Sequence, residues 1–265
     1  MNLVDYIKLY FHMVKYNIMA QMEFKANFIM AMLTEVGFLM SKVLYVVVMY
    51  TVGVKINGMT PEAMLMFVGS YTLITGVMDS VYYPNIASIP EYIRNGELDI
   101  YLTKPISTQY IVSFRKFDIG LGIPNAVAGI AMIVISWNSC DIAVTPLNIL
   151  GYILFTIAGC IMTYPILFIP TMFAFWLVKI DALYDITFAL WDFNNMPMTI
   201  YNKIMKTVGV YIIPIFLITN FAPMFVQGFI PKSYIIFTLF AIPFFFFLTK
   251  LLWDYSVKHY SSASS

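Results

Sequence analysis

The chain has 265 residues, of which 61% are hydrophobic and only 11% are charged. Soluble domains are about half apolar and a quarter charged, so this composition excludes an ordinary water-soluble domain and indicates a membrane protein. The formal charge of +1 leaves no basic excess for binding a nucleic acid. Two cysteines cannot form a disulfide framework. Thirteen of the 15 basic residues are lysine, a bias that suits an AT-rich bacterial genome.

Segment 1–27 is predicted to be an amphipathic helix on the inner membrane surface. Charged residues from Asp5 to Glu23 interrupt it, so it is not an export signal. Its apolar residues recur at spacings of three and four, as on one helical stripe: Leu3, Ile7, Tyr10, Phe11, Val14, Ile18 and Met22. The alternative is a cytosolic packing helix.

Five segments are long and apolar enough to cross a bilayer, which takes about 20 residues. They are residues 28–51, 62–83, 117–137, 149–173 and 234–253. One further crossing between 182 and 228 makes a six-span bundle over 28–253 and a single transmembrane domain. Basic residues gather before the first span, in 84–116 and after the last span. The positive-inside rule therefore places both termini, the 254–265 tail and segment 84–116 in the cytoplasm.

Region 182–228 admits two layouts. In the first, a short fifth span covers about 182–195, and 198–228 dips back as two half-helices broken at Pro214 and Pro223. In the second, 180–206 lies at the cytoplasmic interface and 207–227 is one span. The second layout keeps Lys203 and Lys206 inside, whereas the first requires protein around its irregular backbone.

Segment 84–116 is the longest polar interruption of the chain. Its residues predict a helix starting near Pro90, a break at Asn95-Gly96, a second short helix led by acids and a stop at Lys104-Pro105. A compact helix pair of this kind is typical of a docking surface, although a plain connector is the alternative.

The string Ile93-Arg94-Asn95-Gly96-Glu97-Leu98-Asp99, followed by Leu102 and Lys104-Pro105-Ile106, resembles the "I-R-x-G-E-L-D, L-x-[RK]-P" signature of bacterial ABC-2 family permeases. These proteins are the membrane subunits of ATP-binding-cassette exporters. Ala174-Phe175-Trp176 and the spaced prolines before Gly228 are similar to the second half of that family, although Asn194-Asn195 replaces a glycine common there.

The resemblance implies an all-α membrane protein with an N-terminal interfacial helix, six transmembrane helices, a cytoplasmic coupling helix between spans two and three, and re-entrant half-helices before span six. We therefore adopt the first layout. The resemblance also implies a partner nucleotide-binding ATPase and a second permease subunit, identical or related. The expected ATPase-coupling residues are Ile93, Arg94, Gly96, Glu97, Leu98, Asp99, Lys104 and Pro105, and the expected outer gate is Pro197, Pro214 and Pro223.

The sequence lacks the residues for chemistry of its own. No G-x-x-x-x-G-K-[ST] phosphate cradle occurs, so ATP and Mg²⁺ are expected on the separate ATPase chain and no cofactor on this one. The only histidines, His12 and His259, lie near opposite ends, which argues against a metal site or an acyl-transfer enzyme. A stand-alone secondary transporter or channel is the alternative function, but we find no internal repeat between the two halves.

Four ionisable residues fall in or near the spans. Glu35 and Lys42 are seven residues apart on one face of the first span, and burying their charges in lipid is costly. We expect that face to line the translocation path or the dimer interface, or to bond to a neighbouring helix. Asp79 and Asp118 lie near span ends and are expected to reach the interface. Aromatic residues at span ends are expected to lie at the membrane interface: Tyr82, Tyr83, Trp137, Trp176 and Trp253.

Overall fold

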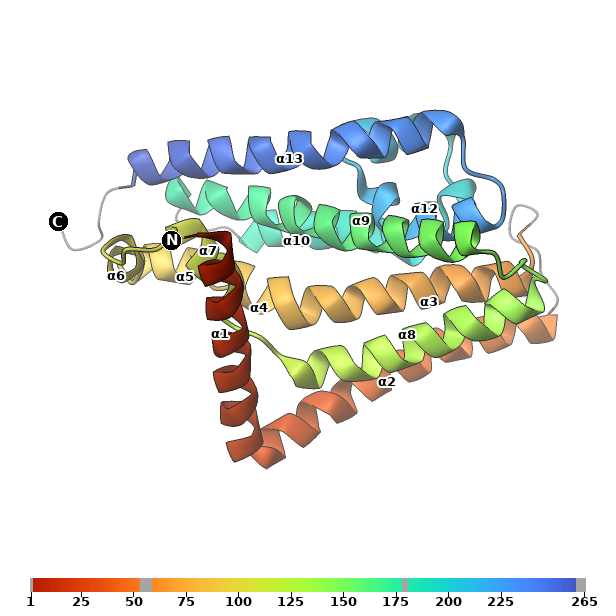
Figure 1. Cartoon of the computed structure of the whole chain (residues 1–265), viewed down its shortest axis with the longest axis horizontal. Coiled ribbons are helices and arrows are strands. Elements are labelled where there is room, and N and C mark those ends of the chain that lie inside the picture. The colour runs from red at the N-terminus through yellow and green to blue at the C-terminus, as the bar shows by residue number, and fades with distance from the viewer. Residues whose placement is uncertain (1, 53–58, 178–180, 261–265) are drawn as a thin grey trace.

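The computed structural model of the chain describes residues 2–52, 59–177 and 181–260. Its secondary-structure elements in these ranges are all helices. Five of them are long and apolar enough to cross a membrane: α2 (Lys25–Val52), α3 (Pro61–Val77) with the turns that extend it to Arg94, α8 (Ile119–Ser139), α9 (Pro146–Thr171) with its extension to Phe175, and α13 (Lys232–Lys258). These helices run along the long axis of the molecule (Figure 1). The chain is therefore a multi-pass helical membrane protein, and the five long spans predicted from the sequence are confirmed.

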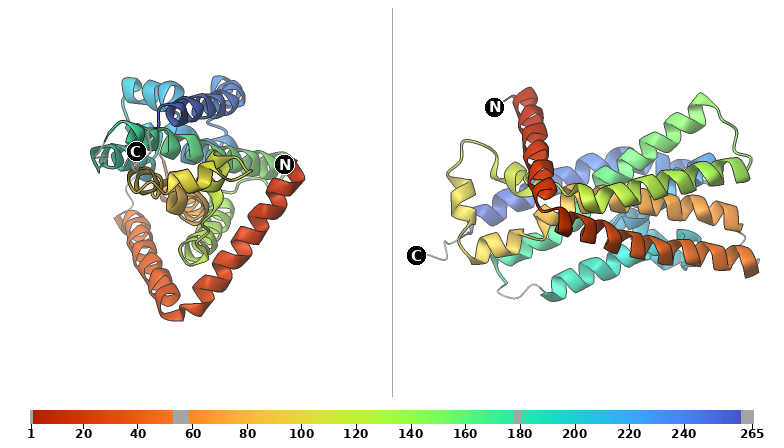
Figure 2. Two further views of the ribbon diagram at one scale, coloured as in Figure 1. Left: turned by 90° about the vertical axis from the view of Figure 1, so that its left-hand side faces the viewer. Right: turned by 90° about the horizontal axis from the view of Figure 1, so that it is seen from below.

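The first helix lies across the bundle. Helix α1 (Leu3–Glu23) is capped by Phe24, and α2 begins at Lys25. The two helices diverge as a V (Figure 2). None of the residues of α1 is buried. Figure 1 shows α1 roughly perpendicular to the long helices, at the end of the molecule where α13 finishes. This direction agrees with the predicted amphipathic helix.

The predicted polar segment forms a group of short helices at that same end. Helix α3 passes through a π-helical turn (Met78–Tyr82) into α4 (Tyr83–Ile86), and α5 (Ile89–Arg94), α6 (Leu98–Leu102) and α7 (Thr108–Phe114) follow. Figure 1 shows α5, α6 and α7 clustered near the start of α1. The predicted helix start near Pro90 and the break at Asn95-Gly96 are both present.

The region before the last span is irregular. Helix α10 (Asp181–Asp192) leads through short 3-10 turns (Phe193–Asn195 and Met198–Ile200) to α11 (Lys203–Thr207), a π-turn (Val208–Ile212) and α12 (Ile215–Val226). Segments Lys203–Ile212 and Ile215–Val226 are bent by 102°. Segment 207–227 is therefore not one straight helix.

The half-helices of the other layout are present, with one correction. The bend falls at Ile213-Pro214, where proline cannot donate the backbone hydrogen bond of a continuing helix. Pro223, in contrast, lies inside α12 and does not divide it. The expected break at Pro223 is therefore wrong, because the surrounding packing of α12 holds a helix that propensity alone would interrupt. Figure 1 shows α12 towards the end of the bundle at which α13 begins.

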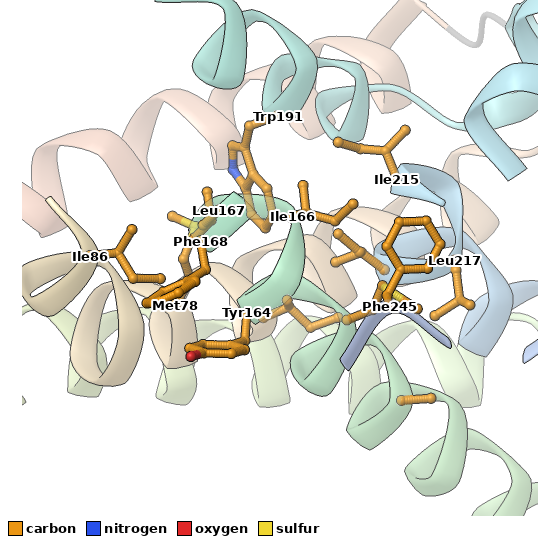
Figure 3. Close-up of a cluster of buried hydrophobic side chains, with 14 of the residues drawn as sticks. Met78, Ile86, Tyr164, Ile166, Leu167, Phe168, Trp191, Ile215, Leu217 and Phe245 are labelled. Carbon is orange, nitrogen blue, oxygen red and sulfur yellow. The ribbon is translucent and has the colours of Figure 1, made fainter. Parts of the chain in front are cut away.

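A continuous apolar core joins α3, α9, α10, α12 and α13. Figure 3 shows part of it, with Met78, Phe168 and Trp191 among the labelled side chains. Trp253 is only 3% exposed and packs against Phe168 and Phe175. Helix α13 continues to Lys258, so Trp253 lies before its end and its ring faces the core. Residues 254–258 of the predicted tail thus belong to α13, and 261–265 lie outside the described residues.

Helices α3 and α8 approach each other closely through glycines. A Cβ atom on Gly129 of α8 would lie 2.7 Å from the Leu73 backbone nitrogen and 2.9 Å from the Gly69 carbonyl oxygen of α3. A Cβ on Gly76 of α3 would lie 2.8 Å from the Asn125 Cβ of α8. Small residues of this kind allow two membrane helices to bring their backbones together. The α3–α8 contact therefore depends on glycine at these positions.

Replacing Gly129 by alanine is expected to destabilise the protein by about 1–3 kcal/mol, as overpacking typically does, because the new methyl group meets backbone atoms that cannot rotate away. Thermal denaturation of the purified variant in detergent measures the change. Gly37→Ala on α2 is the matched control, since nothing lies within 4 Å of its added Cβ. Equal melting temperatures for the two variants would contradict the close α3–α8 contact.

Candidate functional site

Helices α5 and α6 form a projecting pair, here called the knob (residues 89–106), whose apolar residues hold it to the bundle. Ile93 is buried, and Leu98 is 0% exposed in the main core. Between them, Gly96 adopts a φ of 73°, a left-handed conformation that glycine reaches without strain. This turn lets both anchors point into the same core. The motif residues Ile93, Gly96 and Leu98 therefore shape the knob.

The charged residues of the same motif lie on the outside of the knob. Arg94, Lys104 and Pro105 are exposed, and Glu97 and Asp99 are half-buried. Within the described ranges, no ion pair joins Arg94, Glu97 or Lys104 to another side chain. Two apolar side chains lie beside these charges, Ile100 with 57% exposure and Leu102 with 38%. The outer face of the knob thus combines both signs of charge with apolar surface, a composition suited to docking a protein.

Polar bonds tie the base of the knob to the segment that enters α8. The Asn85 side chain donates to the Lys116 carbonyl oxygen at 2.8 Å and accepts from the Lys116 backbone nitrogen at 2.7 Å. The Lys116 amine donates to the Ser88 hydroxyl at 2.6 Å. Arg115 lies over the Tyr101 ring, 5.5 Å from its centroid, and donates to the Tyr101 hydroxyl. Burial raises the pKa of Tyr101, which keeps that hydroxyl protonated. The knob is thus bonded through Tyr101 to Arg115, in the segment that leads into α8.

Tyr164 of α9 connects α7 to the bundle. Its hydroxyl bonds to the Ser113 hydroxyl at 2.9 Å and accepts from the Gln109 amide at 3.2 Å. Its ring stacks on Phe114 of α7 at a centroid distance of 5.9 Å and on Phe246 of α13 at 5.6 Å. The sequence alone does not identify this residue, because a tyrosine inside an apolar run gives no indication of the distant residues to which it bonds.

Helix α1 is bonded to the same short helices. The Tyr110 hydroxyl donates to the Tyr6 carbonyl oxygen at 2.6 Å, and the two rings meet edge to face. Farther along α1, the Gln21 amide donates to the Phe117 carbonyl oxygen at 2.5 Å and its oxygen accepts from the Ile119 backbone nitrogen. The crosswise direction of α1 is therefore fixed by contacts with the residues that precede α8.

Glu35 and Lys42 contact other helices of the same chain. The Asn125 amide of α8 donates to a Glu35 carboxylate oxygen at 2.7 Å, and the Lys42 amine lies 4.9 Å from the centroid of the Tyr71 ring of α3. Both side chains are half-buried. Of the three expectations for this face, the geometry favours a bond to a neighbouring helix.

The two acids near span ends differ in their role. Asp118 precedes α8, and its carboxylate accepts from the Gly120 nitrogen at 2.9 Å and from the Leu121 nitrogen at 3.3 Å. It is therefore an N-cap residue, which explains a charge at this position without a need to reach the interface. Asp79 lies in the π-helical turn that ends α3 and is half-buried.

The expected gate prolines lie in different elements at the other end of the bundle. Pro197 separates two 3-10 turns, Pro214 lies at the 102° bend and Pro223 is inside α12. The 3-10 turns are bonded to α12, since Asn220 accepts from the Met198 backbone nitrogen at 2.7 Å and Thr219 donates to Asn194 at 2.9 Å. In the described ranges, no three His, Cys, Asp or Glu side chains are grouped so that they could hold a metal ion.

The bundle of long apolar helices with a charged knob at one end is that of a multi-pass membrane protein. A family model described as "ABC-2 family transporter protein" matches residues 36–264, and the chain belongs to this family. The resemblance in the knob motif is thereby confirmed. Searches of curated proteins and of solved structures gave no match.

Replacing Leu98 by alanine is expected to loosen the knob, because a buried leucine truncated to alanine typically costs about 2–5 kcal/mol. Amide hydrogen exchange in 95–106 should become faster, while exchange in α9 stays unchanged. Ile100→Ala on the same helix is the control, since Ile100 is largely exposed. Equal exchange in the two variants would show that Leu98 does not anchor the knob.

Proposed function

We propose that this chain is the permease subunit of an exporter, in which two permease subunits, identical or related, bind two ATPase subunits. Membership of the ABC-2 family supports the coarser statement that the chain is a membrane subunit of an ATP-binding-cassette transporter. ATP and Mg²⁺ would be held by the ATPase chains. The observation that carries the proposal is the knob, which is anchored by the buried Ile93 and Leu98 on one side and presents Arg94 and Glu97 on the other.

The outer face of the knob is the proposed contact with the ATPase. Arg94 and Glu97 would make charge-assisted bonds with a groove of the ATPase, and Ile100 would supply apolar contact. The half-buried Asp99 and the exposed Lys104 extend the same face. This arrangement is suited to transmitting a push, because the knob follows α3 in sequence and is bonded to Arg115, in the segment that leads into α8.

Movement of the knob would reach the bundle along two routes. Helix α5 packs against the 3-10 turn that ends α9 (Met172–Phe175). Helix α7 is joined to α9 and α13 through Tyr164. ATP-driven closure of the ATPases would thus displace the ends of α9 and α13 together and reorient the spans. Such rigid-body repacking is a common way of switching between two states.

We infer the sidedness of the chain in the membrane from its charges. Basic residues at both ends of the chain and in 84–116 favour a cytoplasmic knob and cytoplasmic termini, in a bacterial cytoplasmic membrane. The bent pair at the opposite end would then lie on the outer side as a re-entrant gate, with Pro214 at its bend, Pro223 inside α12 and Pro197 between the preceding 3-10 turns. An amphipathic, lipid-like, peptide or drug-type molecule would leave through it, and membrane lipid would surround the exposed apolar faces.

The double variant Arg94→Glu with Glu97→Lys is expected to lower ATPase activity coupled to the permease by about tenfold, since reversing paired charges at an interface costs more than a kcal/mol. The measurement is ATP hydrolysis by the reconstituted complex with its P-loop ATPase subunit. Membrane insertion and the melting temperature of the permease should stay unchanged, because both side chains face outward.

The control for this experiment exchanges an ion pair elsewhere. Lys250→Asp with Asp254→Lys keeps the exposed i,i+4 pair on α13, in which the amine and carboxylate are 2.5 Å apart. This swapped pair should retain full coupling. Unchanged coupling in the knob variant would remove the knob from the mechanism.

Lys203→Cys is expected to react with a membrane-impermeant thiol reagent added to intact cells, in a chain whose own two cysteines are replaced. Lys203 is exposed at the start of α11 and belongs to the proposed outer side. Lys104→Cys on the knob should react only after the membrane is breached. Labelling of Lys203→Cys only in breached cells would overturn the outer gate.

A further inference from the structure

A cavity of about 1030 Å³ opens at the end of the bundle opposite the knob. Its walls come from the start of α3, the turn after α8, the start of α9, and α12 with the residues that follow it. These elements meet at the same end in Figure 1. The size is that of a pocket for a drug-sized molecule.

The charges that line this cavity are all negative. Glu62 in the first turn of α3 and Asp141 after α8 contribute carboxylates, and the described lining residues include no Lys, Arg or His. Neutral polar side chains add further acceptor oxygens: Thr60, Ser139, Asn148, Asn220 and Gln227. A concave site lined by one sign of charge between low-dielectric walls attracts the opposite charge.

Cys140 precedes Asp141 in the chain and lies in the same cavity wall as Glu62. This thiol lines the cavity itself. Burial raises its pKa, and the nearby carboxylates of Glu62 and Asp141 raise it further. The native chain thus carries a thiol in the cavity wall that can report on occupancy of the cavity.

Asp141 has a left-handed backbone conformation, which glycine and asparagine adopt more readily than aspartate. Its φ of 51° is the only positive value at a non-glycine position in the described ranges. Glycine and asparagine are the usual residues at such a helix end. An aspartate here keeps a carboxylate at the cavity wall, and replacing it by asparagine or glycine preserves the turn.

The rest of the wall is apolar. Phe67 and Val226 are buried, and Met198, Pro223 and Met224 also line the cavity. Aliphatic and aromatic groups of a ligand would therefore contact carbon surface directly beside the two acids. The pairing of negative charge with an apolar wall matches a molecule that has a cationic group on an apolar body.

We propose that this cavity binds amphiphilic cations, with Glu62 and Asp141 paired to the cationic group and the apolar wall holding the hydrophobic part. The inference rests on the proposed function, since it names the class of molecule that the exporter would release. Binding itself requires neither the ATPase nor a direction of transport, so it can be tested alone.

The test uses two ions of nearly the same size and shape and opposite charge, tetraphenylphosphonium and tetraphenylborate. The permease carries Cys160→Ala, so that Cys140 is its remaining thiol, and is placed in nanodiscs of phosphatidylcholine. A neutral maleimide alkylates Cys140 at mildly alkaline pH, because the raised pKa leaves little thiolate at neutrality. Equilibrium binding of radiolabelled tetraphenylphosphonium, corrected for empty nanodiscs, gives a second readout that does not depend on the thiol.

Tetraphenylphosphonium is expected to bind and to slow the alkylation of Cys140, whereas tetraphenylborate does neither. Glu62→Gln and Asp141→Asn should each weaken binding about fivefold, as expected for partly exposed ion pairs. Asp141→Gly should match Asp141→Asn, which separates loss of the carboxylate from a change in the turn. Asp254→Asn on the exposed face of α13 should bind like the parent chain.

Three results would overturn the proposal: equal protection by both ions, no binding of either ion, or full cation binding in the Glu62→Gln and Asp141→Asn double variant at an unchanged melting temperature. If the proposed export function is wrong while the binding proposal is right, the experiments give a different result. Cation binding would then persist, but ATP would drive no outward movement of tetraphenylphosphonium in vesicles that contain the complete complex.

Discussion

The close contact between α3 and α8 is the constraint on which the rest of the structure depends. Gly69, Gly76 and Gly129 let the two backbones come together. A side chain at any of these positions would meet atoms of the other helix and force a shift. Asn125 extends the contact to α2 by its bond to Glu35. The same pair of helices supports both ends of the molecule, because α3 leads into the knob at one end and lines the cavity with α8 at the other.

The knob divides its motif between two tasks. Ile93 and Leu98 are buried and hold it to the core, while Arg94 and Glu97 stay unpaired on the surface. A docking surface that transmits force needs both properties, since a loosely held element would absorb the movement that it receives. Tyr164 adds a direct connection to α9 and α13, with hydrogen bonds and ring stacking at one residue. Bonds from α7 therefore add to the contact that α5 makes with the end of α9.

The sequence predicts the parts of this protein that follow from local rules. Span length follows from apolar runs, and the break at Gly96 follows from turn chemistry. What it cannot predict depends on tertiary contacts. Pro223 remains inside α12, and the Trp253 ring is buried against Phe168 and Phe175, because surrounding helices override the local preference. The cavity also escapes prediction, since Glu62, Asp141 and Asn220 come from elements that are far apart in sequence.

Site-specific photocrosslinking tests most directly the claim that the knob receives the ATPase. A photoreactive amino acid replaces Arg94 in one variant and Ile204 in the other, both exposed positions, with Ile204 in the proposed outer half-helix. In cells that express the permease with its P-loop ATPase subunit, position 94 is expected to crosslink to the ATPase and position 204 is not. Crosslinking from position 204, or none from position 94 when the two proteins co-purify, would contradict the account.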